Sequence, residues 1–143
     1  MNGTLKGGCL CGHVRYEYLG EVGPSSYCHC DDCKRATGGP YTVGVLSDAS
    51  KLRILCGKVK GHTLVADSGR QITREFCPEC GAPLFTRAEK LPDKVFIKAG
   101  SLDNPGVVAP SYHTWTERAV PWAYPDKGLP GYPQDRGMSH KTE

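Results

Sequence analysis

Seven of the eight cysteines of this chain stand in three short clusters, and their spacing is that of metal ligands. The clusters are Cys9 and Cys11, then Cys28, Cys30 and Cys33, and finally Cys77 and Cys80. A disulfide between cysteines one residue apart would close a strained ring, whereas two thiolates at that spacing can share one zinc ion without strain. We therefore expect these cysteines to bind zinc rather than to form disulfides.

The first and last clusters predict one structural zinc site. A glycine follows Cys11 in GGCLCGH and Cys80 in FCPECGAP, and a glycine there can adopt a positive φ, which lets backbone amides point at the sulfurs. Four thiolates complete a tetrahedral shell that leaves no position for a substrate. The cysteines expected to hold this zinc are Cys9, Cys11, Cys77 and Cys80. A zinc ion on these cysteines would join segments about seventy residues apart, so we expect its role to be in folding. The alternative is that the four cysteines are reduced, buried thiols without a metal.

The middle cluster offers three thiolates, which is the ligand number of a catalytic zinc site with one exchangeable position. We expect Cys28, Cys30 and Cys33 to hold this second zinc. Three thiolates leave the ion with a net charge of about −1, so it should acidify bound water weakly and suit a visiting thiolate better. Cys56 is the remaining cysteine, and its apolar neighbours in LRILCG favour a small core residue over a fourth ligand.

The composition indicates one domain, without the features of a membrane protein or a nucleic-acid-binding protein. The 143 residues, 38% of them hydrophobic and 23% charged, suit a single domain over residues 1–135 with a disordered tail at 136–143. MNGTLKGG lacks the basic and apolar regions of a signal peptide, and no apolar run is long enough to span a membrane, so we expect a cytoplasmic protein. Seven thiolates and two zinc ions would cancel the formal charge of +3, and no run of basic residues marks a nucleic-acid surface.

Short segments rich in Val, Ile, Tyr and Thr predict a mainly β fold. These segments are HVRYEYL, YTVGVL, KLRILC, HTLVA, QITREFC, PLFTR, KVFIKAG and SYHTW. After Val120 the frequent prolines and glycines indicate a strap that lies over the domain, with Trp122 and Tyr124 as its anchors.

One short helix is expected among the cysteines. Two aspartates, then a lysine and an arginine, favour a helix over residues 31–37, with Gly38 just after its last turn. The amide dipoles at the helix N-terminus would favour the thiolate form of Cys30 and Cys33.

Four motifs of the chain resemble one known family. GGCLCGHVRYE, CHCDDCKRATGG, FCPECGAPLF and HTWTERAVPW stand in the order and at the relative positions found in the glutathione-dependent formaldehyde-activating enzyme family, also called the GFA or centromere protein V family. The resemblance covers about residues 7–132 and implies an Mss4-like fold, in which small β-sheets surround zinc. It implies two zinc ions per chain, a structural one on Cys9, Cys11, Cys77 and Cys80 and a catalytic one on Cys28, Cys30 and Cys33. It also implies the family's activity, which joins glutathione to formaldehyde and is classed as a carbon–sulfur lyase in the reverse direction.

Several other residues are candidates for the substrate site that the resemblance implies. Lys34 and Arg35 follow the third ligand and could hold a carboxylate of glutathione or steady the developing alkoxide; a solvated helix face is the alternative. Trp115 and His113 belong to the last motif, and we expect His113 to line the pocket and move a proton, with a hydrogen-bonded core histidine as the alternative. His29, between two ligands, is expected to point away from the metal.

The expected reaction partners are a small-molecule thiol and a small aldehyde, which meet at a three-cysteine zinc. Two alternatives stay open. A zinc enzyme of the same family could act on another small electrophile, and a non-catalytic zinc-binding module on the same fold could bind a partner protein. A fourth protein ligand at the second site, from Cys56 or His113, would favour the module.

Overall fold

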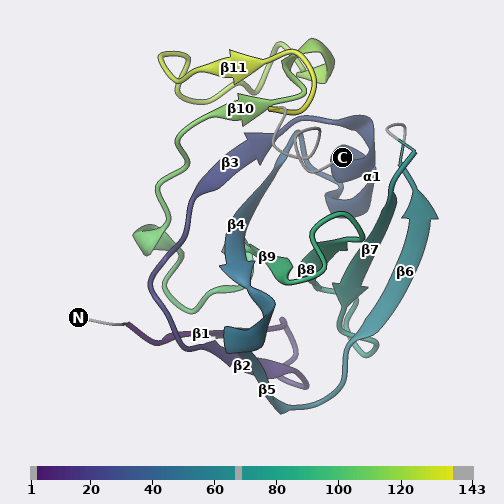
Figure 1. Cartoon of the computed structure of the whole chain (residues 1–143), viewed down its shortest axis with the longest axis vertical. Coiled ribbons are helices and arrows are strands. Elements are labelled where there is room, and N and C mark those ends of the chain that lie inside the picture. Colours follow the sequence, from purple (N-terminus) through teal and green to yellow (C-terminus); the bar gives the residue numbers. More distant parts are fainter. Residues whose placement is uncertain (1–2, 67–68, 137–143) are drawn as a thin grey trace.

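The computed structural model describes residues 3–66 and 69–136, and Figure 1 shows their arrangement. Within these residues the chain forms one α-helix, α1 (Asp31–Thr37), and two β-sheets. The small sheet has the order β1-β2-β5 and contains β1 (Leu5–Gly8), β2 (Arg15–Tyr18) and β5 (Leu52–Cys56). The large sheet has the order β11-β10-β3-β4-β9-β8-β7-β6 and contains β3 (Ser25–Cys28), β4 (Thr42–Asp48), β6 (Lys60–Val65), β7 (Gln71–Phe76), β8 (Pro83–Ala88), β9 (Lys94–Lys98), β10 (His113–Thr114) and β11 (Gly131–Tyr132). The prediction of a mainly β fold with one short helix is confirmed.

The two faces of the large sheet have different surroundings, because successive residues of a strand point to opposite sides. On one face Val45 of β4 lies opposite Ile97 of β9, and both side chains are buried. Tyr16 of the small sheet covers this face, with its ring centroid 5.0 Å from that of Phe85 in β8. The other face, which includes Gly44 of β4, lines a cavity. Helix α1 lies on the cavity side, between the arm of β3 and β4 and the arm of β7 and β6 (Figure 1).

Helix α1 begins and ends where the sequence predicts. Cys30 caps its N-terminus, because the sulfur of Cys30 accepts a hydrogen bond from the backbone N–H of Cys33. Gly38 follows its last turn in the left-handed conformation, with φ of 72°, and its N–H donates to the carbonyl of Lys34 at 2.8 Å. Cys30 and Gly38 therefore fix the first and the last turn of α1.

Substituting Gly38 with alanine should lower the free energy of unfolding by about 1 kcal/mol, because a Cβ is unfavourable at positive φ. Apart from its chain neighbours and the backbone of its own helix, no atom of the described residues lies within 4 Å of the position a Cβ would take, so the expected cost is one of backbone conformation. Gly100→Ala is the matched control, since Gly100 also has open space but no positive φ. Urea unfolding of both variants checks the difference; equal stabilities would contradict it.

The sequence patterns miss the strands β1, β3 and β11. These strands hold two to four residues each and read LKGG, SSYC and GY, so they carry little of the apolar alternation that identifies a strand. They form because neighbours supply their hydrogen bonds: β3 pairs antiparallel with β4 and parallel with β10. This omission matters, because β3 ends at Cys28.

Two residues expected in the interior are exposed, so these predictions are wrong. Cys56 ends β5, an edge strand of the small sheet, and its exposed thiol donates a hydrogen bond to the carbonyl of His13 at 3.6 Å. Trp122 is 75% exposed and anchors nothing. Tyr124 is the anchor of the strap, because its ring stacks 4.3 Å from the ring of His113.

Arg136 marks the start of the tail that the sequence predicts to be disordered. Its guanidinium carbon lies 4.6 Å from the ring centroid of Tyr112, a cation–π contact. The rest of that tail, 137–143, lies outside the described residues. No helix in the described ranges is long and apolar enough to cross a membrane.

Candidate metal centres and cavity

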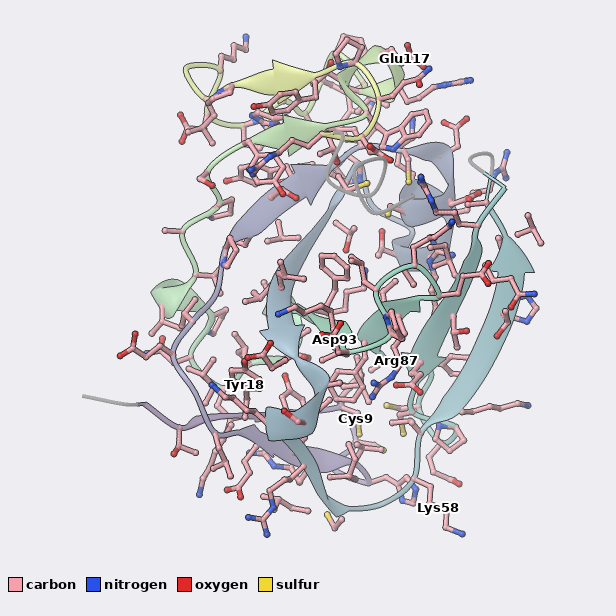
Figure 2. All side chains as sticks on the ribbon, in the orientation of Figure 1. Cys9, Tyr18, Lys58, Arg87, Asp93 and Glu117 are labelled. Carbon is pink, nitrogen blue, oxygen red and sulfur yellow. The ribbon has the colours of Figure 1, made fainter. Side chains whose placement is uncertain are left out.

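Four cysteines from two distant turns form the first candidate metal centre. The sulfurs of Cys9, Cys11, Cys77 and Cys80 all lie within 4.8 Å of one another. Sulfurs bound tetrahedrally to zinc at about 2.3 Å stand about 3.8 Å apart, and the Cys9–Cys11 and Cys11–Cys77 sulfur distances are 3.7 and 3.9 Å. Figure 2 shows Cys9 where the small sheet meets the turn between β7 and β8. The donor set and its spacing fit a closed tetrahedral metal site.

Backbone amides prepare these sulfurs for negative charge. The sulfur of Cys9 accepts a hydrogen bond from the N–H of Val14 at 3.2 Å, and the sulfur of Cys77 accepts bonds from the N–H groups of Glu79 and Cys80 at 3.3 and 3.4 Å. Burial opposes ionisation of Cys9, but the Val14 bond and the neighbouring thiols outweigh it and lower the pKa of Cys9 to about 6. Such hydrogen bonds stabilise the thiolate form that binds a metal.

The second candidate centre is local in sequence. Cys28 ends β3, Cys30 caps α1, and Cys33 lies one turn into the helix. Their sulfurs lie within 4.8 Å of one another, and those of Cys28 and Cys33 are 3.4 Å apart. Neither Cys56 nor His113 belongs to this group. Among the described residues the cluster therefore offers three ligands, which fits a metal site with one position left for a visitor.

Neighbouring sulfurs dominate the electrostatics of the three thiols. The thiols of Cys30 and Cys33 donate hydrogen bonds to Cys28 and hold its pKa well below the ordinary value. The hydrogen bond to Cys28, together with burial, raises the pKa of Cys33 to about 11. The hydrogen bond to Cys28 and burial also raise the pKa of Cys30. The three thiols thus titrate as one coupled group. The N–H of Cys33 points at the sulfur of Cys30 at 3.3 Å, and the expected effect of the helix N-terminus on the thiolates of Cys30 and Cys33 stays a prediction.

A cavity of about 280 Å³ opens against this cluster, and all three of its cysteines line it. Strands β3, β4, β7, β8 and β9 supply its floor, and α1 and Trp115 contribute to its walls. Trp115 has a left-handed backbone, with φ of 57°, which is uncommon for a bulky residue and turns the chain between β10 and the next 3-10 turn, Thr116–Arg118. The structure thus brings Trp115 and the cluster together, as the sequence predicts.

The two predicted cations are not brought to the cavity. The ammonium group of Lys34 donates to the carbonyl of Arg118 at 2.5 Å and forms an ion pair with Asp31 at 3.2 Å. Arg35 is exposed on the outer side of α1 and is not among the lining residues. Lys34 therefore ties the helix to the segment after β10, and Arg35 fits the alternative of a solvated helix face.

His113 is also kept from the cavity. It is fully buried, and its Nδ1 lies 2.9 Å from Nε2 of His29, which is fully buried as well. Its Nε2 lies 3.2 Å from the carbonyl oxygen of Asp126, and the rings of Tyr27 and Tyr124 stack on the imidazole. His113 does not line the cavity, so its geometry is that of the hydrogen-bonded core histidine. His29 pairs with His113 and is absent from the metal cluster.

Sequence reasoning misses three polar residues that do line the cavity. These are Arg74 of β7, Thr86 of β8 and Lys98 of β9. The available signal is a cation next to apolar residues of a strand, as for Arg74 between Ile72 and Phe76 on one face of QITREF and for Lys98 at the end of KVFIK. That signal identifies single residues but not which of them come together. Arg74 and Thr86 are neighbours because of the register of β7 and β8, which is known only from the folded sheet.

Comparison with known proteins agrees with this geometry. Residues 4–118 match the family model described as glutathione-dependent formaldehyde-activating enzyme. A Colletotrichum graminicola protein, provisionally named as such an enzyme, is 24% identical over 132 residues, which cover 90% of this chain and 68% of that protein. The crystal structure of a Rhodobacter sphaeroides protein has the same fold, with a TM-score of 0.55 and 19% identity over 89% of this chain and 98% of that one. The chain therefore belongs to the glutathione-dependent formaldehyde-activating enzyme family.

Proposed function

We propose that this protein is a zinc enzyme that joins a thiol to formaldehyde or another small aldehyde. The observation that carries the proposal is the cavity onto which Cys28, Cys30 and Cys33 open together. A cluster of three thiolates that faces a cavity suits a reacting visitor, whereas a module for partner binding needs no such space. Membership of the family, and the name of the Colletotrichum graminicola relative, support the same reaction class.

The reaction forms one bond and moves one proton. The thiol gives up its proton, its sulfur forms a bond to the carbonyl carbon, and the carbonyl oxygen takes up a proton, so that an S-hydroxyalkyl thioether results. A zinc ion on the three cysteines would supply an open position that favours the thiolate form of the thiol. The chain's own part is to hold that sulfur between α1 and the floor of the sheet, where Trp115 and Phe96 exclude water.

Purified protein loaded with zinc should accelerate adduct formation between a thiol and formaldehyde above the uncatalysed rate. Cys30→Ser should reduce that acceleration at least about a hundredfold, because the thiol loses the group that activates it. Cys56→Ser is the matched control, since this exposed cysteine belongs to neither cluster, and it should keep the wild-type rate. Nuclear magnetic resonance of the adduct carbon follows the reaction. If wild type and Cys30→Ser gave equal rates with every thiol and aldehyde tried, the non-catalytic module would replace this proposal.

A further inference from the structure

Two cations and a hydroxyl lie together on the floor of the cavity. Arg74 of β7 stands directly opposite Thr86 of β8, and Thr86 stands opposite Phe96 of β9. Lys98 follows Phe96 by two residues, so it projects from the same face of the sheet. Gly44 lies opposite Lys98 and adds no side chain there. The register of the strands therefore brings Arg74, Thr86 and Lys98 to one patch, which we call the floor patch.

Among the described residues, the cations of the floor patch have no carboxylate partner. Across residues 3–66 and 69–136, no carboxylate forms an ion pair with Arg74 or Lys98, although Asp32 also lines the cavity. By contrast, two arginines at the rim of the cavity are paired: Arg70 with Asp135 at 3.7 Å and Arg118 with Asp31 at 3.3 Å. Arg74 and Lys98 are half-buried. A partly desolvated cation without a counterion is unfavourable, so the floor patch is suited to an added negative charge.

Two donors of the floor patch have no partner within the described protein. Nε of Arg74 and the hydroxyl oxygen of Thr86 are both buried, and neither forms a hydrogen bond. Buried polar atoms are nearly always satisfied, and those that are not point to a missing ligand or to a function. Burial lowers the pKa of Lys98, the three cysteines oppose that shift and Arg74 adds to it, so the ammonium group is within electrostatic range of both the cysteine cluster and the guanidinium.

The floor patch is also close to the three-cysteine cluster. The ammonium group of Lys98 donates to the hydroxyl of Thr42 at 3.3 Å, and Thr42 stands opposite Cys28 where β3 pairs with β4. Thr42 therefore links the two, and an anion held between Lys98 and Arg74 lies in the same cavity as a sulfur atom placed at the cluster. A thiol that reaches both must carry its negative group near its sulfur.

We propose that Arg74, Thr86 and Lys98 form an oxyanion subsite that binds the carboxylate of the thiol substrate, so that the preferred thiols are compact mercapto acids. This inference rests on the proposed function for the role of the thiol, and on the floor patch for the role of the carboxylate. The guanidinium can donate two parallel bonds to a carboxylate, the threonine hydroxyl adds a third, and Lys98 contributes its charge. The subsite fixes the thiol by its acid group while its sulfur faces the cysteines.

Calorimetric titration of the zinc-loaded protein, without aldehyde, tests the subsite by binding alone. The probes are 3-mercaptopropionate and its uncharged amide, which have the same length and the same thiol. Wild type should bind the acid at least about tenfold more tightly than the amide, because charge-assisted hydrogen bonds distinguish them. Arg74→Gln should reduce this ratio to nearly one, and Thr86→Val, which leaves the charge unchanged, should reduce it severalfold. Glutathione, whose carboxylates lie further from its sulfur, should depend on Arg74 less than 3-mercaptopropionate does.

Arg87→Gln is the matched control. Arg87 is adjacent to Thr86 in β8 but belongs to the opposite face, where it pairs with Glu75 at 3.0 Å. It should therefore keep the wild-type ratio. The subsite would be contradicted if wild type bound the acid and the amide equally tightly, or if Arg74→Gln and Arg87→Gln lowered the ratio of the two affinities equally. Either result would count whatever the rate of the reaction. If the ratio held but no adduct formed faster than background, the proposed reaction would fail and the subsite would stand. If Arg74→Gln did not fold, Thr86→Val and Arg74→Lys would decide, with Arg74→Lys expected to keep part of the ratio.

Discussion

Replacing Cys77 with serine should remove one metal ion per chain and most of the stability of the domain. Cys77 is fully buried, its sulfur lies 3.9 Å from that of Cys11, and two backbone N–H groups point at it. Serine oxygen is a poor substitute for a thiolate, and it leaves those amides without a charged acceptor. The expected loss is about 5 kcal/mol or more, which approaches the whole stability of a typical domain. Metal analysis by mass spectrometry and urea unfolding measure both effects.

Cys56→Ser is the control for this substitution as well. It changes the same atom in an exposed residue that belongs to neither cluster, and it should change the free energy of unfolding by less than about 0.5 kcal/mol. A Cys77→Ser protein that kept its full metal content and its unfolding curve would show that the four-cysteine cluster is a set of buried thiols without a structural metal.

Replacing His113 with alanine should lower the free energy of unfolding by about 3 kcal/mol, since it removes a fully buried ring. The rings of Tyr27 and Tyr124 would lose their stacking partner, and Nε2 of His29 would lose its hydrogen bond at 2.9 Å. The rate of thiol addition, expressed per folded molecule, should stay within about threefold of wild type, because His113 lies outside the cavity. Urea unfolding and the adduct assay, run on the same preparations, separate the two quantities.

The opposite pattern would restore the catalytic role that the sequence suggests for His113. That pattern is a rate at least about a hundredfold lower with an unchanged unfolding curve, as expected for a lost proton-transfer group. His62→Ala provides the control, because His62 is an exposed histidine of β6 that does not line the cavity. It should alter neither the stability nor the rate.

Local signals in the sequence predict the parts of the site that are themselves local. The helix over 31–37 and the left-handed Gly38 follow from the order of charges and from one glycine, and the structure reproduces both. The division of seven cysteines into groups of four and three also follows from spacing, because a tetrahedral metal site takes four ligands and few groupings of these cysteines can supply them. These features depend on residues a few positions apart, or on a ligand number that chemistry fixes.

The substrate face could not be predicted in the same way. Lys34 and Arg35 are next to the cysteines in sequence, yet Lys34 is bonded to Arg118 and Arg35 faces outward. Arg74 and Lys98 are distant in sequence and come together only through the register of β7, β8 and β9. Proximity to the cysteines in the sequence therefore did not predict which cations line the cavity, because the pairing of the strands decides which side chains come together.

The two metal centres also differ in when a growing chain can complete them. The three-cysteine cluster spans six residues, so closing it costs little chain entropy, and the ribosome has delivered every ligand by Cys33. The four-cysteine cluster needs Cys80 and must close a loop that contains four strands of the large sheet, β3, β4, β6 and β7. During synthesis the three-cysteine centre can thus bind an ion while the ligands of the four-cysteine centre, and the strands β8 to β11 beyond them, are still to be made.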